Sequence, residues 1–480
     1  MKYFLMLIQL WVGFLPICAS YPKANIWIIP SVESPQVYRN YAQTSKVHLE
    51  MARGEVEHIQ LVFPSKVNEE YRFTFDRNLK GIQISARELK KMNGYYDALV
   101  PFKNQLKCTD TLTAVWITVQ CPSRVPVGKY HQTIKIEGSK HFTIQLDYNV
   151  HHTTIPLKSS IPITVGVENR CVAEGLNDKE ADKERQRWVD FVLSYRMTPV
   201  FGTQITPERW QYEHSFSPWA WNDKRSIRLL NDRRYSCYML PFFTLSENEL
   251  ASLLCNIQKK GKLKESLFYI WDEPAYMEDY EQIKQKVNII RKYASDARIL
   301  TTFFCGPRNG PRKGDLYAVF DYLKHHIHVA TISLAPCKGN EEEVQHIRYK
   351  VPEGIDWWSY VCWQPGGNEP NFLLQMKGIQ QRAIMWRTWK NGSQGFLYWN
   401  CNIYHKRNPF TYITDMPHGD GILIYPGDIL GRKGPIASAR LERWRDGAEE
   451  MELLRLVEKN YSKEKADTLL NIVYSSPLSF

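Results

Sequence analysis

Two adjacent carboxylates, Asp272 and Glu273, end the apolar run of the stretch LFYIWDEPAYMEDY, residues 267–280. A turn accounts for one of them, because Asp favours turns and Pro274 fixes the chain that follows. Two acids at the tip of an apolar strand indicate a paired-carboxylate site. The alternative is structural, with Asp272 capping the next helix and Glu273 in solvent.

The elements that must position this pair lie in the second part of the chain, where extended segments alternate with helical patterns. Candidate strands span residues 161–167, 198–202, 236–243, 267–271, 298–304, 328–334, 356–363 and 395–400. Helical patterns include residues 182–196, 246–261, 371–391 and 436–460. Eight such units predict an α/β fold, a (β/α)8 TIM-like barrel, whose active site is built at the C-terminal ends of the strands. Asp272 and Glu273 end the fourth strand, on that catalytic face.

The first part of the chain consists of short extended segments separated by turn residues, such as IQLVFPS and AVWITVQCPS. Alternation of apolar and polar residues along them predicts an all-β domain, a β-sandwich. We therefore divide the chain into a signal peptide at residues 1–20, an N-terminal β-sandwich domain at 21–158 and a catalytic barrel domain with a C-terminal helix at 159–480.

The first twenty residues, MKYFLMLIQLWVGFLPICAS, carry Lys2, then an apolar run, then small residues. This pattern is typical of a secretory signal with cleavage before Tyr21, and it predicts a secreted or periplasmic protein. The apolar run is too short for a comfortable membrane span and no later segment approaches one, so we expect no stable membrane span. Alternatives are an N-terminal anchor and a lipid attached to Cys18.

Composition agrees with a globular protein of two domains, since the chain has 480 residues, of which 43% are apolar and 13% aromatic. The 62 basic and 51 acidic residues give a net charge of +11, which is spread along the chain. No nucleic-acid motif accompanies this charge, so we expect no nucleic-acid partner. The charge belongs either to an ordinary basic exported protein or to a surface that meets an anionic partner, such as a sulfated or sialylated glycan.

The ten cysteines include Cys18, which leaves nine in the mature chain without regular spacing. This excludes a disulfide scaffold, although Cys108 and Cys121 bracket one strand region and could pair. No zinc spacing occurs among them. The histidines at 325, 326 and 328 lie where a helix passes into a strand, and alternate strand residues face opposite ways. We expect no metal and no cofactor.

Several fragments, in this order and spacing, resemble glycoside hydrolase family 123 and its uncharacterised relatives. They are WDEP at the end of the fourth strand, DWWSYVCWQP in the seventh, GFLYWN in the eighth, and the later GDGILIYPG and SARLERWRDGAEE. The N-terminal fragments MARGEVEHIQLVF and VWITVQCPSRVPVGKYHQTIKI resemble the β-sandwich of that family. The resemblance covers nearly the whole mature chain.

The resemblance implies an exo-acting β-N-acetylgalactosaminidase that retains configuration and uses the 2-acetamido oxygen of its substrate as the nucleophile. Ordinary retaining enzymes need two carboxyl groups ~5 Å apart on opposite sides of the bond, and substrate-assisted enzymes are an exception. By the motif of the family, Glu273 is the general acid and later base, and Asp272 orients the acetamido group. Glu273 must then be protonated beside an ionised Asp272, so the two acids titrate as a coupled pair.

Aromatic and amide residues that could bind a sugar follow the seventh and eighth strands. They are Trp358, Tyr360, Trp363, Trp399, Asn400 and Asn402. Aromatic rings cover the C–H faces of sugars, whereas core packing is the alternative for Trp358 and Trp399. By analogy with substrate-assisted hexosaminidases, Tyr360 looks like the residue that binds the acetamide carbonyl, and Asn400 could hold a ring hydroxyl. Trp219 and Trp221, in a long loop, either line the cleft rim or pin the loop.

Two later segments have structural interpretations. Asp420, in the turn-rich GDGILIYPG, and Asp428, which follows it directly, are read as acids that serve loop geometry. The segment LERWRDGAEEMELL predicts an amphipathic barrel helix. Two other functions stay open: a catalytically inactive glycan-binding protein on the same fold, and an ordinary hydrolase with a second acid across the cleft.

Overall fold

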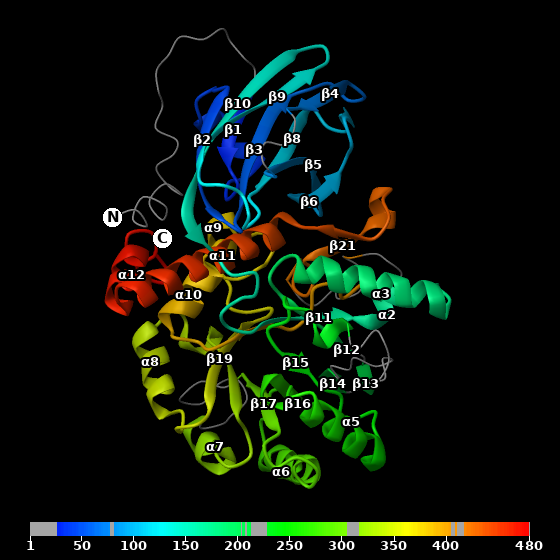
Figure 1. Ribbon diagram of the computed structural model, residues 1–480, viewed down its shortest axis with the longest axis vertical. Helices are drawn as coiled ribbons and strands as arrows, with labels where there is room; N and C mark the ends of the chain where they lie inside the picture. The colour runs from blue at the N-terminus through cyan, green and yellow to red at the C-terminus, as the bar shows by residue number, and fades with distance from the viewer. Residues whose placement is uncertain are drawn as a thin grey trace.

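The computed structural model describes residues 26–76, 81–202, 204–206, 209–212, 228–304, 316–404, 409 and 417–479. Figure 1 shows a β-sandwich above a larger barrel, with the long helix α11 (Ala439–Asn460) between them. The expected signal segment at residues 1–20 lies outside the described residues, as do Trp219 and Trp221.

The N-terminal domain is a sandwich of two five-stranded sheets, as the sequence predicts. The first sheet has the order β1 (Trp27–Pro30), β3 (Val56–Pro64), β8 (Leu112–Gln120), β5 (Gln83–Met92) and β6 (Tyr95–Pro101). The second has the order β2 (Lys46–Arg53), β10 (His141–Thr154), β9 (Gly128–Glu137), β4 (Glu70–Phe75) and β7 (Gln105–Lys107). In β10, alternate residues from Phe142 to Val150 are buried between the sheets, which is the alternation expected of a strand with one solvated face.

The C-terminal domain is an eight-stranded parallel barrel. In chain order its strands are β11 (Ile163–Glu168), β12 (Thr198–Gly202), β15 (Tyr238–Met239), β16 (Ser266–Trp271), β17 (Arg298–Phe303), β18 (Val329–Ser333), β19 (Asp356–Val361) and β20 (Phe396–Tyr398). Each predicted strand is present, although the third is reduced to β15. The expected division at residue 158 falls between β10 and β11.

The barrel is nearly closed. Its hydrogen-bonded order runs from β12 through β11, β20, β19, β18, β17 and β16 to β15. Within the described ranges, no backbone pairing joins β12 to β15. Side chains bridge this gap instead, because the hydroxyl oxygens of Thr198 and Ser236 lie 2.9 Å apart.

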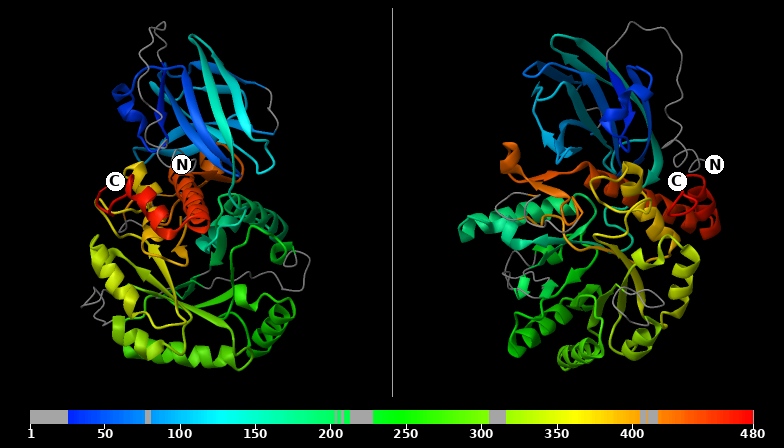
Figure 2. Two further views of the ribbon diagram at one scale, coloured as in Figure 1. Left: turned by 60° about the vertical axis from the view of Figure 1, so that its left-hand side comes forward. Right: turned by 180° about the vertical axis from the view of Figure 1, so that it is seen from behind.

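Helices surround the barrel strands, as the views in Figure 2 show. They are α2 (Asn169–Ala173), α3 (Asp178–Leu193), α5 (Glu247–Lys259), α6 (Met277–Arg291), α7 (Leu316–Leu323), α8 (Glu341–Lys350), α9 (Gly378–Arg382), α10 (Ile384–Lys390) and, after α11, α12 (Lys463–Asn471). Local sequence fixes where two of them begin, since Asn177 with Glu180 and Ser246 with Glu249 form capping boxes.

Shorter elements complete the description. They are the strand pairs β13 (Gln204–Thr206) with β14 (Arg209–Tyr212) and β21 (Ile424–Pro426) with β22 (Pro435–Ala437), and the 3-10 helices η1 (Pro35–Asn40), η2 (Leu263–Glu265), η3 (Ala335–Cys337) and η4 (Gly427–Leu430).

The helix predicted at residues 371–391 begins later than expected, at Gly378. The preceding residues form a loop that is held by Asn371, whose amide donates to the carbonyls of Cys362 and Pro365, each at 2.8 Å. Phe372 and Leu373 of this loop are buried. Tertiary burial therefore explains apolar residues that we had assigned to a helix face.

The amphipathic pattern predicted for α11 is wrong. Its charged residues between Arg440 and Glu452 are buried, because the helix lies between the two domains (Figure 1). Glu442 shows how this charge is accommodated. Its Oε1 accepts from Arg87 of the sandwich at 2.5 Å and from Tyr195 of the barrel domain at 2.8 Å.

Cys108 and Cys121 are buried free thiols and do not form the disulfide that we considered. Cys108 precedes the nine-residue strand β8 and Cys121 follows it. A strand of this length spans roughly 30 Å at about 3.4 Å per residue, far more than a disulfide can bridge.

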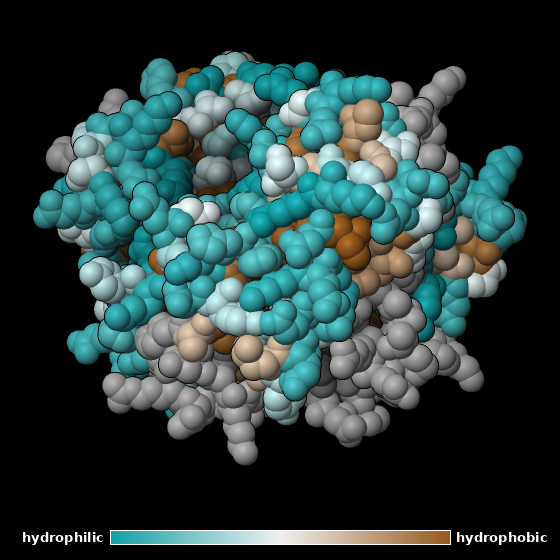
Figure 3. All heavy atoms as spheres, turned by 90° about the horizontal axis from the view of Figure 1, so that it is seen from below, coloured by the Kyte–Doolittle hydropathy of each residue, from teal (hydrophilic) through white to brown (hydrophobic). Residues whose placement is uncertain are grey.

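Figure 3 shows the lower end of the molecule, where the described residues are mainly hydrophilic and the hydrophobic ones among them form only small areas. Among the described residues, no helix combines the length and the apolar character needed to span a membrane.

We predict that Glu442→Gln weakens the fold by about 3–5 kcal/mol at pH 7, because it leaves buried cations without their carboxylate. Burial alone would raise the pKa of Glu442, but Arg445, Arg87 and His58 together hold it well below its ordinary value. The ionised Glu442 therefore stabilises the fold fully at a pH above its ordinary pKa. This stabilisation is lost as the pH falls through the lowered pKa of the folded state. Thermal unfolding at pH 7 and pH 3 should show the difference between wild type and variant shrinking at low pH.

The matched control is Glu458→Gln in the same helix, where the carboxylate is partly exposed and pairs with Arg455 at 3.0 Å. We expect it to change stability by less than about 1 kcal/mol. Equal losses from the two variants would contradict the role given to Glu442.

Candidate active site

Asp272 follows β16 directly and is held by hydroxyl groups from within the barrel. Tyr269 of the same strand donates to its Oδ1 at 2.6 Å, and Thr302 of the neighbouring strand β17 donates to the same atom at 2.8 Å. Two donors on one oxygen are the arrangement that favours an ionised carboxylate. Asp272 is half-buried.

Glu273 has a left-handed backbone, with φ +47°, which is uncommon for a residue other than glycine. Its N–H donates to Oγ1 of Thr302 at 3.0 Å, so the same threonine binds both acids. The Glu273 carboxylate lies toward the opposite part of the barrel mouth, where Tyr360 of β19 donates to its Oε1 at 2.6 Å. Adjacent residues thus direct their carboxylates to different strands.

The two tyrosines that bind these carboxylates stay protonated. Burial, reinforced by Asp272, holds the pKa of Tyr269 well above its ordinary value. Burial and the neighbouring Glu273 do the same to the pKa of Tyr360. Each hydroxyl is therefore a permanent hydrogen-bond donor near neutral pH.

The three tryptophans named from the sequence have different environments. Trp358 is 1% exposed inside the barrel, and its ring fills the space beside Gly395, so it is a core residue. Trp363 is 41% exposed and stacks on Phe304, with ring centroids 6.0 Å apart. Trp399 is partly buried, and its indole N–H donates to Asp420 at 2.9 Å. Trp363 and Trp399 are the two that can present a surface at the strand ends.

The two asparagines also differ. Asn402 is fully buried, and its amide group binds the backbone N–H and carbonyl of Glu168 at 2.7 and 3.3 Å. It joins the end of β20 to the end of β11 and has no amide atom left for a sugar in this arrangement. Asn400 accepts from the N–H of Asn402 at 2.9 Å, whereas its buried Nδ2 has no partner among the described residues.

Asp420, which we read as a loop acid, is 3% exposed and belongs to the same region. Its Oδ1 accepts from Trp399 at 2.9 Å and from Tyr398 at 3.2 Å, and its Oδ2 has no partner within the described part of the chain. Burial raises the pKa of this carboxyl to about 7. Burial, and with it the charges of Asp420, Glu273 and Asp272, holds the pKa of the Cys362 thiol well above its ordinary value.

Sequence reasoning missed Tyr269, Thr302 and the burial of Asp420. Tyr269 and Thr302 are polar residues within buried strands. Because alternate residues of a strand face the same side, the sequence could have indicated that each faces the inside of the barrel. Beside Asp420 the sequence shows only the glycine at 421, and the structure explains it, because a φ of +68° and the closeness of the Trp399 ring exclude a side chain there. Among the described residues, no group of three or more His, Cys, Asp or Glu is placed to hold a metal ion.

The chain matches the family described as glycoside hydrolase 123, catalytic domain, over residues 183–457. It belongs to glycoside hydrolase family 123. Its structure is similar, with a TM-score of 0.69 and 15% identity, to a family 123 glycoside hydrolase from Clostridium perfringens that was analysed for glycolipid glycan hydrolysis. That similarity covers 94% of this chain and 92% of the other.

Other solved structures match less well. A GH10 xylanase from Thermobacillus composti has a TM-score of 0.32 at 13% identity, covering 60% of this chain and 97% of the other. A GH2 beta-galacturonidase from Eisenbergiella tayi has a TM-score of 0.35 at 9% identity, covering 90% and 94%. No curated protein matches the chain in sequence.

For this family 123 glycoside hydrolase we predict that Thr302→Val lowers kcat at least about fivefold. The substitution keeps the shape but removes the acceptor for the Glu273 N–H and a donor to Asp272, which should cost about 1–3 kcal/mol. Thr301→Val is the matched control, because the buried Thr301 hydroxyl has no partner among the described residues. Its kcat and melting temperature should stay near wild type, and equal kcat losses in both variants would contradict the role of Thr302.

A second prediction concerns the pH dependence of stability. The native enzyme keeps a proton on Asp420 up to about pH 7, whereas the unfolded chain releases it near 3.8, so stability falls as the pH rises between these values. The Asp420→Asn variant has no carboxyl to ionise at this position. Its folding stability should therefore not show this fall, which amounts to about 4 kcal/mol between the two pKa values. Melting temperatures between pH 4 and pH 8 test it.

Asp428→Asn in the same turn-rich segment is the control, because Asp428 is exposed. It should keep the wild-type slope. An Asp420→Asn variant whose melting temperature followed the wild-type pH profile would show that Asp420 is not the group that titrates.

Proposed function

We propose that this protein is an exported, exo-acting glycoside hydrolase that removes terminal β-linked N-acetylgalactosamine with retention, by substrate-assisted catalysis. The observation that carries the proposal is the adjacent pair Asp272 and Glu273 at the end of β16, both bound to Thr302. Neighbouring residues of one turn cannot easily stand on opposite faces of a sugar ring, as an ordinary retaining mechanism requires.

In the proposed first step, the acetamido oxygen of the sugar attacks its own anomeric carbon and the bond to the leaving oxygen breaks. Glu273 gives its proton to that oxygen. The ring nitrogen of the resulting oxazolinium carries positive charge, and Asp272 binds its N–H and stabilises the charge. Water then attacks the anomeric carbon while Glu273 takes its proton and the bond to the acetamido oxygen breaks. Two inversions give net retention.

Hydroxyl donors around the pair support this division of roles. Asp272 receives hydrogen bonds from Tyr269 and Thr302, which suits a carboxylate that stays ionised throughout. Tyr360 donates to Glu273, and the same protonated hydroxyl is a suitable donor for the acetamide carbonyl once the sugar is bound. That contact, inferred from hexosaminidases, stays a prediction.

Residues at the strand ends supply the proposed sugar site. Trp363 offers an exposed ring and Trp399 a ring fixed by Asp420, whereas Asn400 is 1% exposed, so its contact with a ring hydroxyl stays a prediction. We no longer include Trp358 or Asn402, because the barrel core and the backbone of Glu168 occupy them. The clostridial relative, analysed on glycolipid glycans, favours a glycoconjugate as the substrate. Export is proposed from residues 1–20 alone.

The test is hydrolysis of a chromogenic N-acetyl-β-galactosaminide beside its gluco-epimer and the galactoside that lacks the acetamido group. We expect the acetamido galactoside to be at least tenfold better than its epimer, and the compound without the acetamido group to be inert. Asp272→Asn should lower kcat at least 100-fold while sugar affinity, measured by calorimetry, changes only a few-fold, because Asp272 acts mainly in the transition state.

Asp279→Asn is a suitable control from the same segment, since within the described part of the chain the Asp279 carboxylate accepts from the backbone N–H groups of Ala275 and Tyr276 before α6. Its kcat should match wild type. A glycan-binding protein would show no turnover and would lose affinity on the Asp272 substitution. Turnover of the compound without an acetamido group, with a trapped glycosyl-enzyme, would establish the two-carboxylate alternative.

A further inference from the structure

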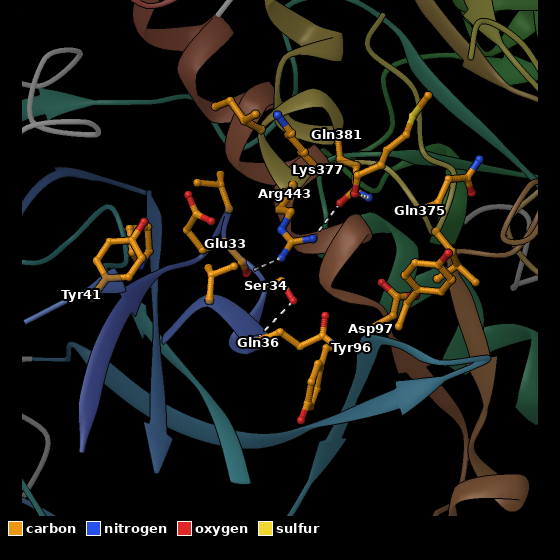
Figure 4. A pocket seen from close by; sticks show the side chains of 18 residues that line it. Glu33, Ser34, Gln36, Tyr41, Tyr96, Asp97, Gln375, Lys377, Gln381 and Arg443 are labelled. Carbon is orange, nitrogen blue, oxygen red and sulfur yellow. Dashed lines mark hydrogen bonds between the residues drawn. The ribbon is translucent and has the colours of Figure 1, made fainter. Parts of the chain in front are cut away.

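A cavity of about 540 Å³ lies between the sandwich and the barrel, away from the residues assigned to catalysis. Figure 4 shows its walls, which come from three places. One is the segment from β1 through η1, the second is the start of β6, and the third is α9 with the loop before it, together with α11. Its volume is in the range of small-molecule sites.

Arg443 of α11 is the more buried of the two cations that line this cavity, at 6% exposure. Its Nε donates to the carbonyl of Ser31 and its Nη1 to the side chain of Gln381, both at 2.8 Å. Its Nη2 reaches only the carbonyl of Glu33, at 3.5 Å. Within the described residues every acceptor of Arg443 is therefore neutral.

The other buried arginines of this helix differ in this respect. Arg440 pairs with Asp97 at 2.9 Å, and Arg445 pairs with Glu442. The pKa of each is raised, whereas burial lowers the pKa of Arg443 to about 10 because Asp97 and Asp446 offset it only in part. A buried cation without an anionic partner is costly, which makes this guanidinium a ready site for an anion.

The remaining charged residues of the cavity are one lysine and two acids. Lys377 lines it and is exposed, so it adds a second cation at the solvent side. Glu33 is the opposing acid, and it interacts with the hydroxyl of Tyr41. Asp97 also lines the cavity but is already paired with Arg440 and accepts from Tyr425 at 2.5 Å.

The rest of the wall is suited to a sugar ring. Tyr41, Tyr95 and Tyr96 provide aromatic surface, and the amides of Gln36 and Gln375 provide donors and acceptors at the exposed edge. Aromatic faces with a few convergent polar groups are the usual construction of a carbohydrate site.

We propose that this cavity is a second glycan-binding site, separate from the catalytic centre, for a sugar that carries a carboxylate or sulfate group. Arg443 and Lys377 bind the anionic group, and the tyrosines cover the ring. Such a site would hold an acidic branch of a glycoconjugate while another part occupies the barrel mouth. The inference depends on family membership and not on the proposed galactosamine specificity.

The experiment measures binding to the full chain by calorimetry, with two matched pairs of ligands. Methyl β-glucuronide is compared with methyl β-glucoside, and methyl β-galactoside 6-sulfate with methyl β-galactoside. We expect the acidic member of at least one pair to bind at least tenfold more tightly than its neutral partner. The pair that shows the difference identifies carboxylate or sulfate as the group bound.

Three variants locate the binding. Lys377→Glu should lower the affinity for the acidic sugar at least fivefold without changing kcat/KM on a small aryl glycoside. Arg443→Gln should abolish binding of the acidic sugar. Lys103→Glu, an exposed residue of the sandwich, should leave binding unchanged. If Arg443→Gln does not fold, Lys377→Glu alone decides the outcome.

Several results would overturn the inference. They are equal affinity for acidic and neutral sugars, affinity unchanged in Lys377→Glu, inorganic sulfate binding as tightly as the sulfated sugar, and acidic-sugar binding lost in Asp272→Asn. The last result would assign the ligand to the catalytic centre. Failure of the galactosaminide assay would not affect any of these measurements, so the two proposals can be judged separately.

Discussion

The buried charges of α11 are the constraint on which the arrangement of the two domains depends. A buried charge that loses its partner costs several kcal/mol, so the charges of this helix that are paired, unlike Arg443, hold their partners in place. Glu442 takes its partners from Arg87 of the sandwich and Tyr195 of the barrel domain, and Glu449 takes Val56 and Arg196 in the same way. One relative placement of the domains meets these demands together. Electrostatic pairing therefore fixes an interface that apolar packing alone would hold less specifically.

The same interface reaches the mouth of the barrel through Arg440. This fully buried residue binds Asp97 of the sandwich and donates to the carbonyl of Gly419 at 2.8 Å, which fixes the turn that carries Asp420. Asp420 in turn binds the indole of Trp399. A chain of hydrogen bonds thus connects the sandwich to an aromatic residue beside the strand ends. The N-terminal domain contributes to the geometry of the site although it supplies none of the acids assigned to catalysis.

The candidate active site itself combines local strain with support from distant strands. A left-handed Glu273 costs on the order of 1 kcal/mol, and such strain persists only where the surroundings determine the conformation. Thr302 of β17 and Tyr360 of β19 provide that support. The parallel barrel brings these residues to one end, and its hydrogen bonds hold them there. The rigid scaffold accounts for how two neighbouring acids can serve different purposes.

The sequence alone determined the two fold classes, the eight strands and the place of Asp272 and Glu273 at a strand end, because alternation, apolar runs and turn residues are local properties. Tertiary structure decided which residues meet. Thr302 became a partner of both acids, Asp420 a buried acid, Trp358 a core residue and Asn402 a backbone ligand only through contacts between segments far apart in the chain. The same reason explains α11, where a pattern of charges that indicates a solvated face is instead satisfied by partners from two domains. Local patterns cannot specify such long-range pairings.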